Sequence, residues 1–222
     1  MLFRSKPAII SLLLMFVENA HSLAMIAHSM CVIKSAVQHV SSLQIPVIAL
    51  DQPLFALAKQ MQWTLSDFSD AQFVIMLGGL QIEIASFKML GEWLSGSGWA
   101  EVMCNAGVAT QGVAESFLSV SHVTRTQHAH QVTAVSLHIL MSKAYSEYQA
   151  KSRENGQENL LSKEEWKDAM SKKSPQFHCW SSVLNLELIC LRLVRALREG
   201  NFSLYIDALR QIVPWMFVMD WT

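Results

Sequence analysis

Two short apolar runs, separated by a single helical segment, constrain the fold of this chain more than any other feature. The first run, Ile45–Leu50, is rich in β-branched residues and is followed by Asp51, and the second, Phe73–Leu77, leads into Gly78-Gly79. Short runs that are apolar on both faces are typical of strands in a buried parallel sheet. Pro53 predicts the start of a helix between them, because proline in the first helical turn forfeits no hydrogen bond. The pattern predicts a right-handed strand–helix–strand crossover.

The segments around this crossover have helical periodicity. We expect helices over residues 21–40, 54–63, 80–94, 133–148, 162–170, 177–197 and 203–213. The segment 177–197 is apolar all round, which is typical of a central core helix, and Gly200 follows it at the position of a helix C-cap. Pro214 is expected to end the last helix. The predicted fold class is α/β and predominantly helical, with a short parallel strand–helix–strand unit at about residues 45–94.

We expect a single, incomplete domain over residues 1–222. It consists of a helical lead-in (1–44), the α/β unit (45–98) and a helical region (99–222). Within the helical region, residues 151–173 are rich in charge and predict an exposed excursion. Ser162 and Glu165 have the spacing of a capping box, which predicts a short helix inside this excursion.

The composition excludes several classes of protein. Apolar residues make up 51% of the chain and charged residues 16%, which argues against intrinsic disorder. The formal net charge is −1, so composition gives no electrostatic case for binding nucleic acid or an anionic membrane. Because no two cysteines form a CxxC pair, we interpret all four as reduced, mostly buried thiols: Cys31, Cys104, Cys179 and Cys190.

The N-terminal segment has two interpretations. Arg4 and Lys6 precede an apolar run over residues 8–17, and the small residues up to Ala24 resemble a signal-peptide cleavage site. Against secretion, Glu18 closes the run early and no cysteine framework follows, so we favour an intracellular protein, nuclear or cytoplasmic, over one secreted after cleavage near Ala24. In the intracellular case the run is a buried strand or a buried helix. It is also too short for a transmembrane helix.

Asp51 is the strongest candidate for a functional residue. It stands at the carboxyl end of a predicted buried strand, where α/β folds place ligand-binding and catalytic groups. A carboxylate at that position binds a divalent cation when further carboxylates lie within reach. The alternative is that Asp51 caps the helix that follows, since aspartate is a preferred N-cap.

Glu83 is the weaker candidate, as a second acid beside Asp51. It lies on the helix after the second strand, as does Glu92, and the alternative for both is a solvated surface position. A group of three histidines surrounds Arg125, and we interpret it as surface or capping residues: His122, His128 and His130.

The end of the chain is unusually apolar. Residues Pro214–Thr222 carry bulky side chains, whereas the ends of most chains are polar. This run needs a partner surface inside the fold or on another chain, unless the reading frame has been cut within a domain. Self-association is predicted through Trp215, Phe217 and Trp221.

Several strings of this sequence resemble a family of transposable-element-derived animal proteins. They are Pro46–Leu54, Met76–Glu83, Gly96–Trp99, Ser121–Arg125, Ala129–Val132 and Leu197–Phe202. The order of helix, strand ending in Asp51, helix, strand and helix is similar to the later half of an RNase H-like transposase core. Such cores use three acids around two divalent metals. By this resemblance Asp51 is the second acid, while Gln81 stands where the family tends to carry histidine.

The resemblance implies a transposon-derived remnant of an RNase H-like DNA transposase or integrase core that is inactive as a nuclease. If activity survives, it is phosphodiester chemistry at Asp51 and Glu83 with Mg²⁺ or Mn²⁺, and the partner is DNA. The alternative is a non-enzymatic helical protein-interaction module.

Overall fold

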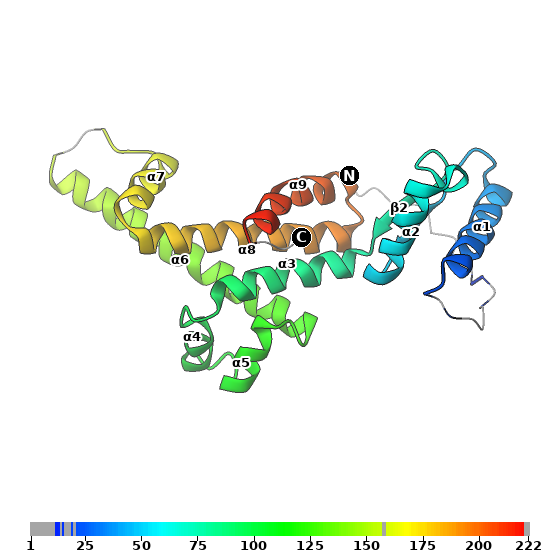
Figure 1. Ribbon diagram of the computed structural model, residues 1–222. Coiled ribbons are helices and arrows are strands. Elements are labelled where there is room, and N and C mark those ends of the chain that lie inside the picture. Colours follow the sequence, from blue (N-terminus) through cyan, green and yellow to red (C-terminus); the bar gives the residue numbers. More distant parts are fainter. Residues whose placement is uncertain (1–11, 14, 16–18, 20, 157–158, 220–222) are drawn as a thin grey trace. The chain divides into compact units, whose positions relative to one another are not determined.

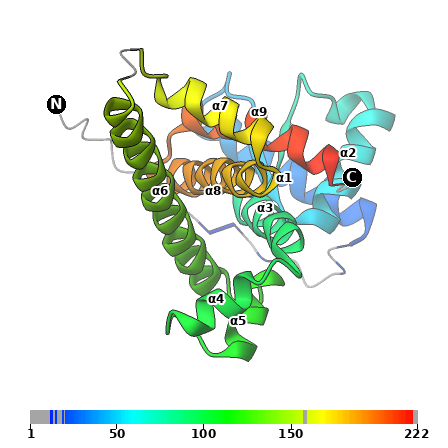
Figure 2. The ribbon, with the colours of Figure 1, turned by 90° about the vertical axis from the view of Figure 1, so that its left-hand side faces the viewer.

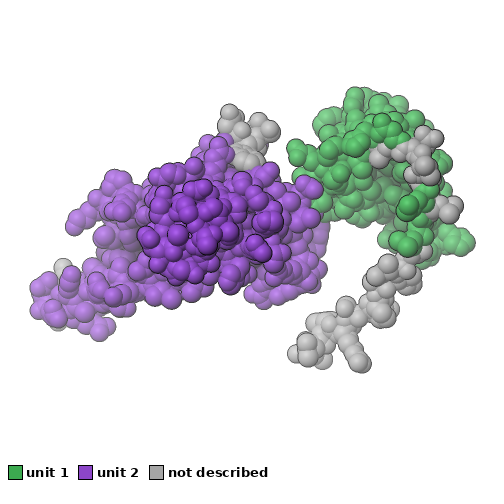
Figure 3. Space-filling view, turned by 90° about the horizontal axis from the view of Figure 1, so that it is seen from below, with its two compact units in different colours: residues 1–78 green, residues 79–222 purple. Residues whose placement is uncertain are grey.

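A computed structural model of the protein describes residues 12–13, 15, 19, 21–156 and 159–219 (Figure 1). The chain divides into two compact units, residues 1–78 and residues 79–222 (Figure 3). This division separates the two strands from the helix at 80–94 that the sequence-based grouping joined to them. The apolar run at 8–17 and the leader-like segment before residue 21 lie mostly outside the described residues.

Helices dominate the described residues, which confirms a predominantly helical α/β class. In chain order the elements are α1 (Leu23–Val40), β1 (Val47–Leu50), α2 (Gln52–Thr64), the 3₁₀ helix η1 (Ser66–Phe68), β2 (Val74–Leu77), α3 (Gly79–Leu94), α4 (Trp99–Asn105), α5 (Gln111–Leu118), α6 (Val123–Glu154), α7 (Lys163–Lys173), α8 (Pro175–Glu199) and α9 (Phe202–Val218).

Unit 1 contains the predicted strand–helix–strand arrangement. β1 and β2 pair in parallel with Val47 opposite Val74 and Leu50 opposite Leu77, and α2 connects them. One face of this sheet packs on α1 and α2 in a core that includes Ile26, Met30, Ile48, Ala58, Met61, Phe73 and Ile75. The side chains of Val47 and Val74, on the opposite face, are 60% and 41% exposed.

α8 is the central helix of unit 2, as its all-round hydrophobicity predicts. It contacts α3, α6, α7 and α9 (Figures 1 and 2). Leu186 and Leu193 are fully buried. The Ser174 hydroxyl accepts a hydrogen bond from the N–H of Phe177 and caps its start, and Gly200 ends it in the left-handed conformation that glycine adopts without strain.

Gly91 allows α3 and α5 to approach each other closely. A Cβ at Gly91 would overlap the carbonyl oxygen of Leu118 at the end of α5, with the carbonyl carbon and Cα of Leu118 only 2.8 Å away. α5 in turn packs against α4 and α6. The missing side chain at Gly91 therefore determines where the α4–α5 pair sits on unit 2.

α6 is longer than predicted at both ends. It begins at Val123, whereas the sequence pattern predicts a start at Thr133, and it ends at Glu154. The prediction is wrong because the buried stripe of the first turns contains polar residues such as Thr126 and Gln127, which hide the apolar periodicity.

α9 does not end at Pro214, as the sequence predicts, but continues to Val218. An interior proline removes one N–H donor and crowds the carbonyl four residues earlier, yet the helix continues for four residues beyond it. Trp215 is half-buried, with its ring centroid 5.1 Å from that of Trp93, whereas Phe217 is exposed. Trp221 lies outside the described residues.

The charged excursion is less exposed than predicted. Its Trp166 is buried and packs against Tyr145, Tyr148 and Phe177, with ring centroids 5.3, 6.2 and 5.3 Å away. Burial of these aromatic rings anchors α7 between α6 and α8. The predicted capping box is confirmed, because the Ser162 and Glu165 side chains each accept a hydrogen bond from the other's backbone N–H.

In the part of the chain that the structure describes, two helices are long and apolar enough to cross a membrane by length and composition alone, namely α1 and α8. Half of the most apolar stretch of α8 is buried within the protein. Core helices of soluble proteins are often as long and as apolar as this. α1 is near the N-terminus, where signal sequences also meet it. These two helices are weak evidence for a membrane span.

Candidate functional site

Asp51 lies at the carboxyl end of β1 and caps α2. Its Oδ1 accepts a hydrogen bond from the backbone N–H of Leu54 at 3.2 Å, and the side chain is exposed. The capping role that the sequence offered as an alternative is therefore confirmed. This carboxylate also lies near the positive end of the helix dipole, where a negative charge is stabilising.

Replacing Asp51 by alanine is expected to lower the free energy of unfolding of unit 1 by about 1 kcal/mol, because the N–H of Leu54 loses its acceptor. Asparagine caps helices as well as aspartate does, so Asp51→Asn is expected to retain most of that stability. Thermal unfolding followed by circular dichroism measures both variants. An alanine variant as stable as the parent chain would contradict the capping role.

Glu83 is buried, so its interpretation as a solvated surface position is wrong. Its carboxylate accepts a hydrogen bond from the side-chain amide of Gln127, and the carbonyl oxygen of Gln127 accepts one from Arg198. These three side chains come from α3, α6 and α8. The relay satisfies a carboxylate whose burial without partners would be costly.

The structure does not bring together a cluster of metal ligands in its described part. No group of three or more His, Cys, Asp and Glu side chains there is arranged to hold a metal ion. Asp51 belongs to unit 1 and Glu83 to unit 2. All four cysteines are free, but only Cys190 is buried, so the prediction of mostly buried thiols is wrong.

His130 and Glu187 form a hydrogen-bonded pair at the centre of unit 2. His130 Nδ1 and Glu187 Oε1 are 2.8 Å apart, and both side chains are completely buried. The His130 ring lies between Phe87 and Trp99, with ring centroids 4.9 and 5.4 Å away and interplanar angles of 16° and 15°. The interpretation of His130 as a surface or capping residue is therefore wrong, whereas His122 and His128 are exposed.

Burial sets the ionisation of this centre. It raises the pKa of the Glu187 carboxyl, while the charge interaction and hydrogen bond with His130 act in the opposite direction. Burial, and the neighbouring Glu187, raise the pKa of the Cys190 thiol well above its ordinary value. A thiol held in this neutral form is a poor nucleophile.

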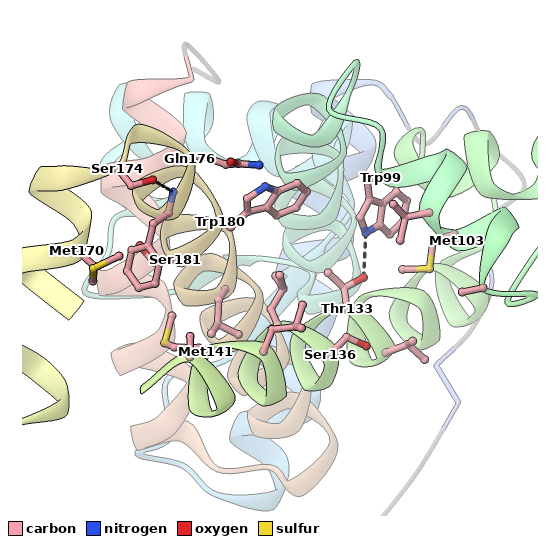
Figure 4. A pocket seen from close by; sticks show the side chains of 18 of the residues that line it. Trp99, Met103, Thr133, Ser136, Met141, Met170, Ser174, Gln176, Trp180 and Ser181 are labelled. Atoms are coloured by element: carbon pink, nitrogen blue, oxygen red, sulfur yellow. Dashed lines mark hydrogen bonds between the residues drawn. The ribbon is translucent and has the colours of Figure 1, made fainter. Parts of the chain in front are cut away.

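A groove lies beside this centre, between α4, α6 and α8. Its volume is about 580 Å³, and Trp99 and Met103 line one end and Met170 the other (Figure 4). α6 contributes the longest row of lining residues, Val132, Thr133, Ser136, Leu137, Leu140, Met141 and Ala144. Their spacing of three and four positions places them on one face of the helix. α8 supplies the facing wall through Gln176, Phe177, Trp180, Ser181 and Leu184.

The groove is apolar, with a small number of uncharged polar groups. The hydroxyl of Thr133 accepts a hydrogen bond from the indole N–H of Trp99 at 2.9 Å, and that of Ser181 donates to the carbonyl oxygen of His178. Ser136 and Gln176 also line the groove, and their exposed side chains make no hydrogen bond to the described part of the protein. They are the groups that remain available to a ligand.

Trp99 connects the groove to the buried His130–Glu187 pair. Trp99 lines the groove, and the ring of the same residue stacks on His130. The position of the groove wall at α4 therefore depends on the Phe87–His130–Trp99 stack. The sequence did not reveal this stack, because its three rings come from three separate helices, α3, α4 and α6.

The helical spacing of α6 places His130 in a row of residues on one face of the helix, although the spacing alone does not show that this face is buried. Gln127, His130, Thr133 and Ala134 are three or four positions apart and share the face on which Leu137 lies. Because this row is buried in the structure, His130 is a core residue. The groove itself had no comparable signal, because its walls come from segments far apart in the chain.

Comparisons with known proteins place the chain in one family. Neither the comparison with curated proteins nor that with solved structures found a match. A family model described as a domain of unknown function (DUF8702) matches residues 5–167, which cover all but the first four residues of unit 1 and run through unit 2 into the first half of α7. Because this match spans well over half of the 222 residues, the chain belongs to the DUF8702 family.

Proposed function

We propose that the protein is a non-catalytic binding module that holds an uncharged, largely apolar small molecule in the groove of unit 2. The observation that carries this proposal is the composition of the groove: among its described lining residues, none is Asp, Glu, Lys, Arg or His. A charged ligand group placed there would lose its hydration without gaining a counter-charge, which is costly. An apolar ligand gains from leaving water.

The dimensions and polarity of the groove also support a small molecule. Ligand pockets in proteins usually have volumes of about 300–1,000 Å³, mostly apolar linings and a few polar groups that orient the ligand. The volume of about 580 Å³ lies inside this range. Ser136 and Gln176 offer hydrogen bonds to one or two uncharged polar groups on such a ligand.

Adjacent residues on α6 provide a matched test of this proposal. Leu140 lines the groove and is 61% exposed, whereas Ile139 does not line it and is 59% exposed. We expect the full chain to bind decan-1-ol saturably in isothermal titration calorimetry, and to bind decanoate and decylammonium at least about tenfold more weakly. Leu140→Lys should weaken decan-1-ol binding by about tenfold or more, and Ile139→Lys should leave it unchanged.

Two results would contradict the proposal that the ligand binds in the groove. The first is equal loss of binding in both lysine variants, since only one of them changes the lining. The second is tighter binding of either charged ligand than of decan-1-ol. If none of the three compounds binds, the proposal for a small apolar ligand is wrong, and a groove of this shape is then left for a helical segment of a protein partner.

The transposon origin is a second, separate proposal. It is supported by the sequence resemblance and by the parallel β1–α2–β2 arrangement, in which Asp51 follows β1. DNA as a partner and Mg²⁺ or Mn²⁺ as cofactors belong to this proposal alone. Reading the genomic frame upstream of Met1 tests it: a preceding strand that ends in aspartate is expected, and an untranslated leader would contradict it.

A further inference from the structure

α9 has two apolar faces, and unit 2 covers only one of them. Tyr205, Ala208 and Ile212 are buried where α9 packs on α8. A second row remains on the outside, with Phe202 65% and Phe217 68% exposed. A helix that is apolar on more than one face is normally covered on each of them. α9 does not line the groove, so its outer row is independent of the proposed ligand site.

The outer row of α9 is self-complementary. Phe202, Ile206, Val213 and Phe217 make up most of it, with spacings of four, seven and four positions that read the same in both directions, and Leu209 lies near the centre of this symmetry. At about 100° per residue, these four side chains fall within roughly 60° of the helix circumference. Two copies of such a row, laid antiparallel, place a phenylalanine opposite a phenylalanine and Ile206 opposite Val213.

This symmetry is the property that a two-fold dimer interface requires. In an isologous interface, residue i of one copy contacts residue j of the other, and residue j contacts residue i. No acidic or basic side chain stands within the outer row of α9. The flanking charges, Asp207 and Arg210, have opposite signs and form an exposed ion pair at 3.9 Å, so each can also pair with its counterpart on a second copy.

We propose that the protein forms a homodimer through antiparallel pairing of α9 with α9 of a second copy, with Phe202 of each chain packed against Phe217 of the other. Of the residues through which the sequence predicted self-association, this arrangement uses Phe217. It does not use Trp215, whose ring packs against Trp93 within the same chain.

Adjacent residues again provide the test. Multi-angle light scattering of the full chain, at increasing concentration, is expected to show a monomer–dimer equilibrium. Phe217→Lys should weaken dimerisation by at least about tenfold, because it places a charge in the apolar interface. Val218→Lys should have no effect, because Val218 is 76% exposed but lies outside the outer row. A strictly monomeric parent chain, or a Phe217→Lys variant that dimerises normally, overturns the proposal.

Cross-linking tests the antiparallel arrangement without relying on a destabilised interface. In a background where the exposed Cys31 and Cys179 are replaced by serine, Phe202→Cys and Phe217→Cys chains are mixed and oxidised. The mixture should form a disulfide-linked dimer, whereas each variant alone should not. Identical positions are 15 residues apart along the paired helices, or roughly 22 Å at the rise of an α-helix. Cross-linking of either variant with itself overturns the arrangement.

Discussion

Replacing His130 by alanine is expected to lower the free energy of unfolding of unit 2 by roughly 3–5 kcal/mol. The change removes the ring between Phe87 and Trp99 and leaves the carboxylate of Glu187 buried without its partner. Removing one partner of a buried hydrogen-bonded pair is costly, because the remaining polar group is neither hydrated nor satisfied. His128→Ala, two positions earlier and exposed, is the matched control and should change stability by less than about 0.5 kcal/mol.

The effect of His130→Ala should also depend on pH. Burial raises the pKa of Glu187, so the stability this carboxyl contributes is present below its ordinary pKa and is lost as pH rises through the folded-state value. Without His130, the influences that lower this pKa disappear, so it rises further. The deficit of the variant should therefore widen as pH rises above the ordinary pKa of a glutamate.

Urea unfolding followed by tryptophan fluorescence measures this effect in unit 2, because Trp63 is the only tryptophan in residues 1–78. A deficit that stays constant across the pH range would contradict the influence of His130 on the pKa of Glu187. A variant as stable as His128→Ala would contradict the burial of the ring itself.

Replacing Gly91 by alanine is expected to destabilise unit 2 by roughly 3 kcal/mol. The new Cβ meets the backbone of Leu118, which cannot rotate away as a side chain would, so α5 must shift relative to α3. The higher helix propensity of alanine offsets about 1 kcal/mol of this cost at most. Thermal or urea unfolding of the full chain measures the difference.

Gly112→Ala is the matched control for this prediction. Gly112 also lies in a helix, but a Cβ there meets nothing within 4 Å. That variant should be as stable as the parent chain or up to about 1 kcal/mol more stable, because only helix propensity changes. If both glycine variants behave alike, the close approach of α3 to α5 is wrong.

The features that the sequence predicted correctly are local ones. The parallel crossover depends on two runs of five or six residues and the turn residues beside them. The capping box at Ser162 and Glu165, the C-cap at Gly200 and the cap at Asp51 each depend on side chains within a few positions of the backbone groups they satisfy. Such signals can be read from one segment without knowledge of the rest of the fold.

The features that the sequence did not reveal arise from contacts between distant segments. Trp99 and Thr133 are 34 positions apart, and His130 and Glu187 are 57 apart. Whether a polar residue on a helix faces solvent or a partner depends on which helix packs against it, and periodicity alone leaves that open. For the same reason, Glu83 could not be distinguished from a surface acid before Gln127 and Arg198 were placed beside it.

The site of decan-1-ol binding tests most directly whether the groove of unit 2 holds an apolar ligand. Methionine methyl groups can report where the ligand binds. Met103, Met141 and Met170 line the groove, whereas Met30 and Met61 are buried in the core of unit 1. In ¹³C-methyl-methionine NMR spectra of the full chain, titration with decan-1-ol should shift the three groove methyls saturably and leave Met30 and Met61 in place. Unchanged groove methyls at saturating ligand, or shifts confined to methionines outside the groove, would contradict the proposal that unit 2 binds an apolar ligand there.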